Sequence, residues 1–395
     1  MPSTRDRDPA LVVYITTVPL SALTLLRGQL GYLREHGFDV VVVSSPGEEL
    51  STLAELEGVR VFSVSMRRDI SPVRDLISLF RLFRLLCRLQ PTVVNASTPK
   101  ASLLGTLAAW MARVPVRIYT LRGLRLETVT GLKKQVLRLA ERATAAAATH
   151  VVCVSEGLRR VCVDLGLAPE SKTLVLGAGS SNGVDAERFS PPGDGTERSL
   201  KLRGELGIPE DAPVIGFVGR LARDKGVPEL FDAFQTLSEC FPKTRLILLG
   251  RHEDEDPIPP SYRRRLGSHP RVALVGFALD TAPFFHLMDL LALPSYREGF
   301  PNVVLEAAVA GVPTVGFRST GVTDAVVDGQ TGLLVSPGDG DALAKACTRL
   351  LENEAHRTEL GAAARQRALK DFSSERIWEK WSQLYRSEST VCDSK

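Results

Sequence analysis

The chain has 395 residues, which is more than one ordinary core accommodates, so two domains are expected. Hydrophobic residues make up 44% and charged residues 24%, the balance of a globular protein. The low aromatic content of 6% argues against a base-stacking surface, so we expect no nucleic-acid partner. The net charge of +3 is too small to indicate a class of partner.

The six cysteines form no Cys-x-x-Cys pair and have no histidine at zinc-ligand spacing. We therefore expect reduced thiols, no metal site and a cytoplasmic location. No apolar stretch of the sequence approaches the roughly 20 residues that a membrane span needs. Any membrane contact is expected to be peripheral, at the inner face of the cell membrane.

Short apolar, β-branched runs alternate with helical patterns in the first half of the chain. Strands are predicted at 11–16, 40–44, 59–64, 93–95, 116–120 and 151–155, and one helix is predicted over 25–36. Strands that alternate with helices predict βαβ units and a parallel sheet. The segment 190–195, Ser-Pro-Pro-Gly-Asp-Gly, has turn chemistry and no periodicity, so we interpret it as a linker.

The same pattern restarts after this segment. Strands are predicted at 214–218, 245–249, 272–275, 290–293, 314–317 and 332–335, and helices at 228–240, 341–354, 355–369 and 374–385. We therefore predict an α/β fold with two Rossmann-like, doubly wound domains, 1–192 and 193–372, followed by a crossover helix and tail, 373–395. Ligands of such sheets bind at the carboxyl ends of the strands, so a cleft between the two sheets is the expected site.

The most specific motif runs from Pro294 to Glu306, Pro-Ser-Tyr-Arg-Glu-Gly-Phe-Pro-Asn-Val-Val-Leu-Glu. It follows a predicted strand, and Pro301 suits the first position of a helix. Free backbone N–H groups at the helix start favour an anion, and the carboxylates of Glu298 and Glu306 can accept hydrogen bonds from sugar or ribose hydroxyls. The alternative is that Glu298 is solvated and Glu306 lies on the surface.

The second motif, from Gly216 to Gly226, follows the first strand of the second half. Two of its cations, Arg220 and Lys225, lie in a glycine-bounded loop and suit a diphosphate leaving group. The spacing of a P-loop is absent. The alternative interpretation is a basic surface loop.

Together these motifs resemble the retaining family 4 glycosyltransferases of the GT-B fold, near the capsular-polysaccharide branch. The resemblance implies transfer of a hexose or N-acetylhexosamine from a nucleotide-diphosphate sugar, with UDP expected, to a polyprenyl-diphosphate-linked glycan in surface polysaccharide synthesis. It implies that Glu298 contacts the donor sugar, Glu306 the ribose, and Arg220 with Lys225 the diphosphate. Other donor-binding positions implied by the resemblance are Gly219, Gly276, Gly299, Phe300, Asn302 and Val303.

The same resemblance implies that the leaving diphosphate takes the acceptor proton, so no cofactor, metal or protein base is expected. It also implies that the segment 374–385 is a helix that crosses back onto the first domain.

The first half matches this family more loosely. The run from Thr98 to Gly105 resembles the acceptor-side motif of the branch, which places Thr98 and Lys100 on the acceptor side. Arg122 stands where many relatives carry histidine. Because arginine stays protonated, we expect Arg122 to hold a donor or acceptor phosphate rather than act as a base. This departure leaves open the alternative of an inactive sugar-nucleotide-binding protein. A separate alternative is a non-transferring GT-B enzyme such as a sugar-nucleotide epimerase, against which the match to the capsular branch argues.

The acidic run Glu253-Asp-Glu-Asp256 contains an Asp-x-Asp sequence, which is the manganese motif of a different glycosyltransferase fold. It lies in a polar, proline-rich segment, so we interpret it as a solvated acidic loop.

A basic stripe marks the predicted helix 73–89. Its arginines are Arg74, Arg81, Arg84 and Arg88, and Leu76, Leu79, Phe83 and Leu86 are predicted on the opposite side. Such a stripe fits anionic lipid headgroups or a lipid diphosphate at a membrane surface. The alternative is an ordinary helix with a solvated face.

Overall fold

The computed structural model describes residues 9–67, 69, 71–191, 196–254 and 256–393. The chain divides into two compact units: unit 1 contains residues 1–182 and 374–395, and unit 2 contains residues 183–373. The boundary expected between 192 and 193, and most of the linker expected at 190–195, fall on residues outside the described part. Unit 2 begins earlier because the backbone N–H of Val184 bonds to the carbonyl of Phe372, at 2.9 Å.

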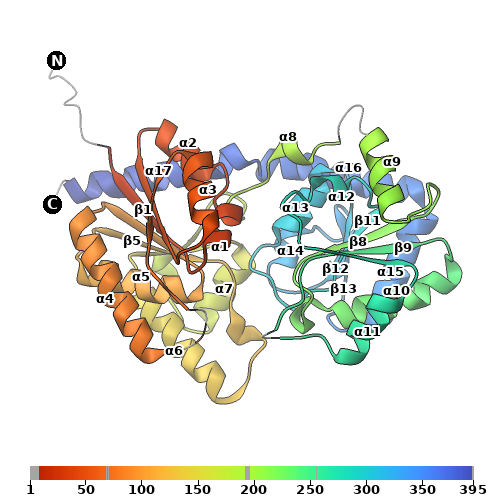
Figure 1. Ribbon diagram of the computed structural model, residues 1–395, viewed down its shortest axis with the longest axis horizontal. Coiled ribbons are helices and arrows are strands. Elements are labelled where there is room, and N and C mark those ends of the chain that lie inside the picture. Colours follow the sequence, from red (N-terminus) through yellow and green to blue (C-terminus); the bar gives the residue numbers. More distant parts are fainter. Residues whose placement is uncertain (1–8, 68, 70, 192–195, 255, 394–395) are drawn as a thin grey trace. The chain divides into compact units, whose positions relative to one another are not determined.

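Unit 1 is built on a parallel sheet with the strand order β3-β2-β1-β4-β5-β6-β7 (Figure 1). Its strands are β1 (Leu11–Ile15), β2 (Asp39–Ser44), β3 (Arg60–Ser63), β4 (Val93–Ser97), β5 (Val116–Leu121), β6 (His150–Cys153) and β7 (Thr173–Val175). All strands predicted in the first half are present, and β7 is an additional strand that the sequence patterns did not indicate.

The helices of unit 1 are α1 (Pro19–Leu25), α2 (Gln29–Glu35), α3 (Glu48–Glu57), α4 (Pro72–Leu89), α5 (Pro99–Met111), α6 (Gly131–Ala147), α7 (Glu156–Asp164) and the last helix of the chain, α17 (Ser374–Asp393). The single helix predicted over 25–36 is wrong. The chain forms α1 and α2 instead, because Gly28 between them has a φ of +76° and interrupts the helical hydrogen bonding.

Two apolar layers cover the faces of this sheet. On one face, Leu30 of α2, Leu53 of α3 and Trp381 of α17 belong to one core cluster. On the other face, Leu86 of α4 and Leu104 of α5 belong to another. Figure 1 shows α4, α5 and α6 as neighbouring helices, with α5 in contact with both of the others.

Helix α4 has an apolar side that is buried at its end and exposed at its start. Leu86 is buried, and Leu79 and Phe83 pack against the core, but Leu76 is 67% exposed. The helix has 18 residues and is about 27 Å long, whereas the five-residue strands of the sheet span only about 17 Å. The first turns of α4 therefore extend past the sheet that its later turns cover, so Leu76 is exposed although it belongs to the apolar side of the helix.

Unit 2 contains a second parallel sheet with the order β10-β9-β8-β11-β12-β13. Its strands are β8 (Val214–Val218), β9 (Arg245–Leu249), β10 (Val272–Gly276), β11 (Leu290–Leu293), β12 (Thr314–Phe317) and β13 (Gly332–Val335). The strands match the predicted ones within one residue, because each is a short apolar run, and all except the edge strand β10 are largely buried.

The helices of unit 2 are α8 (Ala186–Phe189), α9 (Thr196–Glu205), α10 (Val227–Cys240), α11 (Pro260–Ser268), α12 (Ala282–Phe285), α13 (Asn302–Val309), α14 (Val322–Ala325), α15 (Gly340–Glu352) and α16 (Glu354–Asp371). A single core cluster joins the sheet to α10, α11, α15 and α16. Among the described residues of both units, no helix is long and apolar enough to cross a membrane.

Candidate functional site

The cation-bearing loop of unit 2 connects β8 to α10 and lies against the end of β11. Gly226, the last residue of the loop, has a φ of +66°. A Cβ at this position would lie 2.0 Å from the carbonyl oxygen of Pro294, directly after β11. Only glycine therefore allows this close approach. It brings together the two sequence motifs, which are far apart along the chain.

Salt bridges join the charged residues of these loops. The Lys225 Nζ lies 2.6 Å from Glu298 Oε1, and both side chains are largely buried, with 14% and 16% of their surfaces exposed. The Arg220 guanidinium lies 2.6 Å from Glu253 Oε2 and is about half exposed. The alternative of a solvated Glu298 is therefore wrong, whereas Arg220 of the basic loop remains at the surface.

The acidic run after β9 supplies part of this arrangement. The side chain of Glu253 is only 15% exposed because it binds Arg220, and Asp256 Oδ2 accepts a hydrogen bond from the backbone N–H of Asp224 at 2.9 Å. Isolated bridges pair Leu221 with His252 and Ala222 with Pro257, which fixes the acidic run beside the cationic loop. The interpretation of this run as a solvated loop is wrong for Glu253. Glu255 lies outside the described residues.

Asp224 is a further buried acid that the sequence analysis missed. Its Oδ2 lies 2.6 Å from the Arg297 guanidinium and 3.6 Å from that of Arg220, and its Oδ1 is buried without a hydrogen-bond partner. Asp224 follows Arg220 by four residues, a spacing that pairs opposite charges on a helix. The sequence therefore offered a signal for this contact, although the segment is not a regular helix. Asp224 links the loop after β8 to the loop after β11.

Glu306 lies in α13 and is half-buried. Burial raises the pKa of its carboxyl to about 7, and the positive charge of Arg188 acts in the opposite direction. The Arg188 side chain donates to the carbonyl of Leu279 at 3.0 Å and lies 3.3 Å from Asp280. The carboxyl of Glu306 is thus poorly solvated, in contrast to the salt-bridged Glu298, and it is suited to accept hydrogen bonds from hydroxyl groups.

The remaining predicted donor positions lie along the same strand ends. Gly219 directly follows β8, and Gly276 ends β10, where its carbonyl accepts a hydrogen bond from Gly250 at 2.8 Å. The carbonyl of Gly299 leaves no room for a side chain at Gly321, since a Cβ there would lie 2.4 Å away. These close backbone contacts fix the loops that carry the charged residues.

Phe300, Asn302 and Val303 lie at the start of α13. Phe300 is almost wholly buried, and its ring centroid lies 5.2 Å from that of Phe372. Pro301 has an extended conformation and precedes the helix, which begins at Asn302. The prediction of Pro301 as the first helical residue is therefore wrong by one position.

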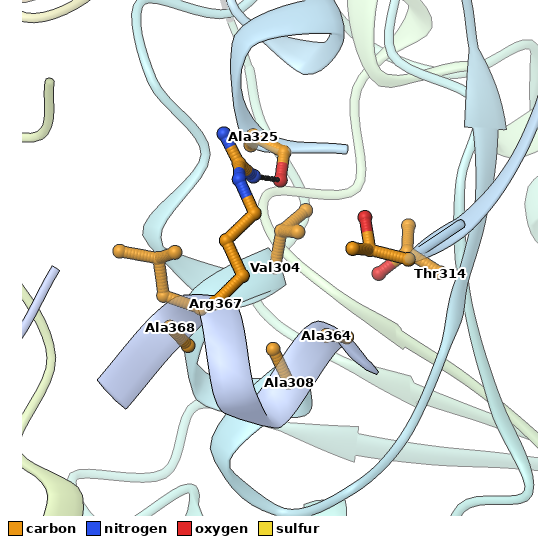
Figure 2. Close-up of a pocket in the computed structure, with 9 residues that line it drawn as sticks. Val304, Ala308, Thr314, Ala325, Ala364, Arg367 and Ala368 are labelled. Carbon is orange, nitrogen blue, oxygen red and sulfur yellow. Dashed lines mark hydrogen bonds between the residues drawn. The ribbon is translucent and has the colours of Figure 1, made fainter. Parts of the chain in front are cut away.

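A small pocket of about 10 Å³ lies between α13 and α16, where Val304 and Ala308 face Ala364 and Ala368 (Figure 2). Figure 2 shows Arg367 beside it, donating to the carbonyl of Ala325. The space is enough for about one water molecule, so it is no candidate for a substrate site.

In unit 1, Arg122 directly follows β5 and has unusual surroundings. It donates to the hydroxyl of Ser181, its Nε is buried without a hydrogen-bond partner, and burial lowers the pKa of its guanidinium to about 10. The groups that oppose this shift in the pKa of Arg122 are the phenols of Tyr14 and Tyr385, not a carboxylate. Arg122 is therefore a poorly compensated cation with an unused donor.

A buried polar network that the sequence did not reveal lies beside Arg122. The hydroxyls of Tyr14 and Tyr385 are 2.7 Å apart, Asn95 Nδ2 donates to Tyr385 at 2.8 Å, and Thr120 donates to Asn95 at 2.7 Å. Tyr385 comes from α17, so the last helix of the chain completes the surroundings of a residue that follows β5.

Thr98 and Lys100 lie at the start of α5. The Thr98 hydroxyl is 2.7 Å from that of Thr17, and Lys100 Nζ lies 2.5 Å from Asp75 of α4. Lys100 is mostly buried, and the carboxylate of Asp75 compensates its charge. Within the described residues of both units, no group of three or more His, Cys, Asp or Glu side chains is placed to hold a metal ion.

Known proteins are similar to this chain over nearly its whole length. Residues 24–179 match the glycosyl transferase 4-like domain, and residues 199–367 match the glycosyl transferases group 1 family. The capsular polysaccharide biosynthesis glycosyltransferase CapM of Staphylococcus aureus is 37% identical over 376 residues, which cover 95% of this chain and 97% of CapM.

An Escherichia coli relative, UDP-Gal:alpha-D-GlcNAc-diphosphoundecaprenol alpha-1,3-galactosyltransferase, is 26% identical, with 82% of each chain covered. Among solved structures, Anabaena HepE in complex with UDP-glucose superposes with a TM-score of 0.79 at 22% identity, covering 95% of this chain and 99% of HepE. A sucrose-phosphate synthase from Thermosynechococcus elongatus superposes with a TM-score of 0.78 at 21% identity, covering 97% of this chain and all of the synthase chain. These structures show the same fold.

The two Rossmann-like units, the paired motifs at one strand edge and the match to CapM over almost its full length agree with one another. The chain therefore belongs to the family 4 glycosyltransferases of the GT-B fold, and it is a glycosyltransferase.

Proposed function

We propose that the protein is a retaining glycosyltransferase that moves a hexose or N-acetylhexosamine from a UDP-sugar to a polyprenyl-diphosphate-linked glycan in surface polysaccharide synthesis. The observation that carries the proposal is the convergence of Arg220, Lys225 and Glu298 at one edge of the unit 2 sheet. The names of CapM and of the E. coli galactosyltransferase, together with the UDP-glucose bound by HepE, support the choice of donor and acceptor class.

The donor is bound by unit 2. Arg220 and Lys225 bind the diphosphate, because a charged donor forms stronger hydrogen bonds to phosphate oxygens than a neutral one. Glu298 accepts hydrogen bonds from the donor sugar, and Glu306 from the ribose hydroxyls. The backbone at Gly219, Gly276 and 299–303 lies along the nucleotide, where the absence of side chains at the glycines permits close contact.

The reaction proceeds on one face of the sugar. The bond from the anomeric carbon to the diphosphate oxygen breaks, the acceptor oxygen forms its bond on the same face, and the acceptor proton passes to the leaving diphosphate. Arg220 and Lys225 stabilise the charge that develops on that leaving group. Arg122 cannot accept a proton, so it contributes by holding a donor or acceptor phosphate. Thr98 and Lys100 belong to the acceptor side.

The donor assignment is tested by saturation-transfer NMR of the purified protein with UDP-, GDP- and ADP-sugars. We expect one UDP-sugar to bind, and Glu306→Ala to abolish its binding. If no nucleotide sugar binds, the proposal is refuted. Transfer to a lipid-linked glycan, with retained configuration at the anomeric carbon, separates the enzyme from an inactive binding protein and from an epimerase that acts without an acceptor.

A lipid-linked acceptor requires that the protein reach a membrane surface, and unit 1 has a surface that fits this need. We define the apolar stripes as the exposed hydrophobic residues of α4 and α6, which are Val73, Leu76, Ile77, Phe80, Leu132, Val136 and Leu139. They recur every three or four residues near the starts of both helices, so each stripe lies along one side of its helix.

The charges around the apolar stripes favour an anionic bilayer over a protein partner. Exposed cations accompany both stripes: Arg74, Arg81, Arg84 and Arg88 on α4, and Lys133 and Arg142 on α6. The acidic residues of these helices are turned to other partners, Asp75 to Lys100 and Glu141 to Tyr119. An apolar surface bordered mainly by cations is typical of helices that lie in a lipid headgroup layer.

Vesicle flotation tests this membrane contact. We expect binding to phosphatidylcholine vesicles only when phosphatidylglycerol is included, and weaker binding by the double variant Leu76→Ser/Phe80→Ser. Leu56→Ser is the matched control, because Leu56 is equally exposed but belongs to α3 on the opposite face of the sheet. Equal binding by the double variant and the control contradicts the membrane contact and leaves the donor assignment intact.

A further inference from the structure

The charges of the proposed diphosphate site are balanced before any ligand binds. Three cations and three carboxylates are paired within it: Arg220 with Glu253, Lys225 with Glu298 and Arg297 with Asp224. A nucleoside diphosphate that enters such a site adds negative charge to a neutral set. The carboxylates must therefore oppose its binding unless they move away or lose their charge.

Glu253 is the carboxylate best placed to have this effect. Its Oε2 lies 2.6 Å from Arg220, and its Oε1 accepts a hydrogen bond from the backbone N–H of Asp254 at 3.1 Å. Its own N–H bonds to the carbonyl of Leu221 at 3.3 Å. Both the side chain and the backbone of Glu253 are thus fixed beside the one cation of the site that is half exposed.

We infer that Glu253 acts through Arg220 as an internal counter-ion that weakens the binding of nucleoside diphosphates. The inference rests on the proposed function, which assigns the diphosphate to Arg220. Glu253 is a positioning residue, since it contacts Arg220 and not the reacting atoms. Its benefit lies in turnover, because a site that binds the leaving diphosphate tightly enough to assist bond breaking must still release the product.

The variant Glu253→Gln separates charge from shape. Glutamine keeps an oxygen that accepts a hydrogen bond from Arg220, but it removes the negative charge. We expect the dissociation constant for UDP, measured by calorimetry, to fall by about three- to tenfold, since an opposing charge beside a partly buried anion is removed. Uridine, which lacks the diphosphate, should bind with less than about a twofold change.

Asp254→Asn is the matched control. It removes one negative charge from the same loop, but Asp254 is exposed and makes no salt bridge to Arg220 among the described residues. We expect it to change UDP binding by less than about twofold, because exposed charges are screened. A second control combines Glu253→Gln with Arg220→Gln, in which the gain in UDP affinity should disappear because the effect acts through Arg220.

Kinetics give a readout that a purely structural role would not change. With Glu253→Gln we expect a lower KM for the donor, stronger inhibition by UDP and a lower kcat, while the melting temperature stays close to that of the wild type. Unchanged or weaker UDP binding by Glu253→Gln, or an equal effect on uridine, overturns the inference alone. If the wild-type protein does not bind UDP, the proposed function fails and the inference fails with it.

Discussion

The cations proposed to bind phosphate are stabilised in different ways in the two units. In unit 2, Arg220 and Lys225 each lie 2.6 Å from a carboxylate. In unit 1, Arg122 donates to a serine hydroxyl and lies near two tyrosines, with one buried nitrogen left without a partner. A paired cation needs no ligand to be stable but must exchange its partner to bind one, whereas an unpaired buried cation gains from any anion that reaches it.

The largest expected effect concerns catalysis in unit 2. Lys225→Met should lower kcat/KM for transfer by about 10²- to 10³-fold, because it removes a cation from the developing charge of the leaving group. Steady-state transfer assays measure this loss. Lys243→Met is the control, since Lys243 lies on the surface of the same unit and pairs with Asp211. A Lys225→Met variant with near wild-type transfer contradicts the proposed role.

The next prediction compares how much the carboxylate-paired cation of unit 2 and the unpaired cation of unit 1 each contribute to stability. Lys225→Met leaves the largely buried Glu298 without its partner, so we expect the free energy of unfolding to fall by about 1–3 kcal/mol. Arg122→Met removes a buried charge that no carboxylate compensates, so we expect no loss or a small gain in stability, although transfer should fall. Urea unfolding of both variants measures the contrast, and equal destabilisation by the two substitutions would remove the distinction between the units.

A smaller effect concerns the pH dependence of Glu306. Its pKa of about 7 means that the carboxylate form becomes dominant only above neutral pH. If the carboxylate accepts the ribose hydroxyls, uridine should bind up to about tenfold more tightly at pH 8 than at pH 6, since uridine itself does not titrate in this range. NMR titration measures the affinity, and Glu306→Gln should bind uridine equally at both pH values.

The raised pKa of Glu306 also makes the stability of the fold depend on pH, and this dependence runs opposite to that of uridine binding. The pKa of Glu306 is higher in the folded protein than its ordinary value of 4.5, so the folded state retains this proton more strongly than the unfolded one. The contribution of Glu306 to stability is therefore greatest at acidic pH and is lost as the pH rises from about 4.5 to about 7. A comparison of wild-type and Glu306→Gln unfolding across this range isolates it, and parallel pH profiles of the two proteins would contradict the shift.

The strands of both sheets except β7, the fold class and the two charged motifs of unit 2 were predictable from the sequence. Each depends on local information, namely buried apolar runs of strand length, glycines at the loops, and charged residues at fixed spacing within one loop. The spacing also placed Arg220 and Lys225 together, because only four residues separate them.

Only the tertiary structure decided which charges compensate one another. Glu253 meets Arg220 because β8 and β9 are neighbours in the sheet, and Tyr385 lies near Arg122 because α17 packs on unit 1, more than 260 residues further along the chain. The exposure of Leu76 likewise depends on where the sheet ends beneath α4. Such pairings and exposures arise from contacts between segments distant in sequence, which local spacing and composition do not encode.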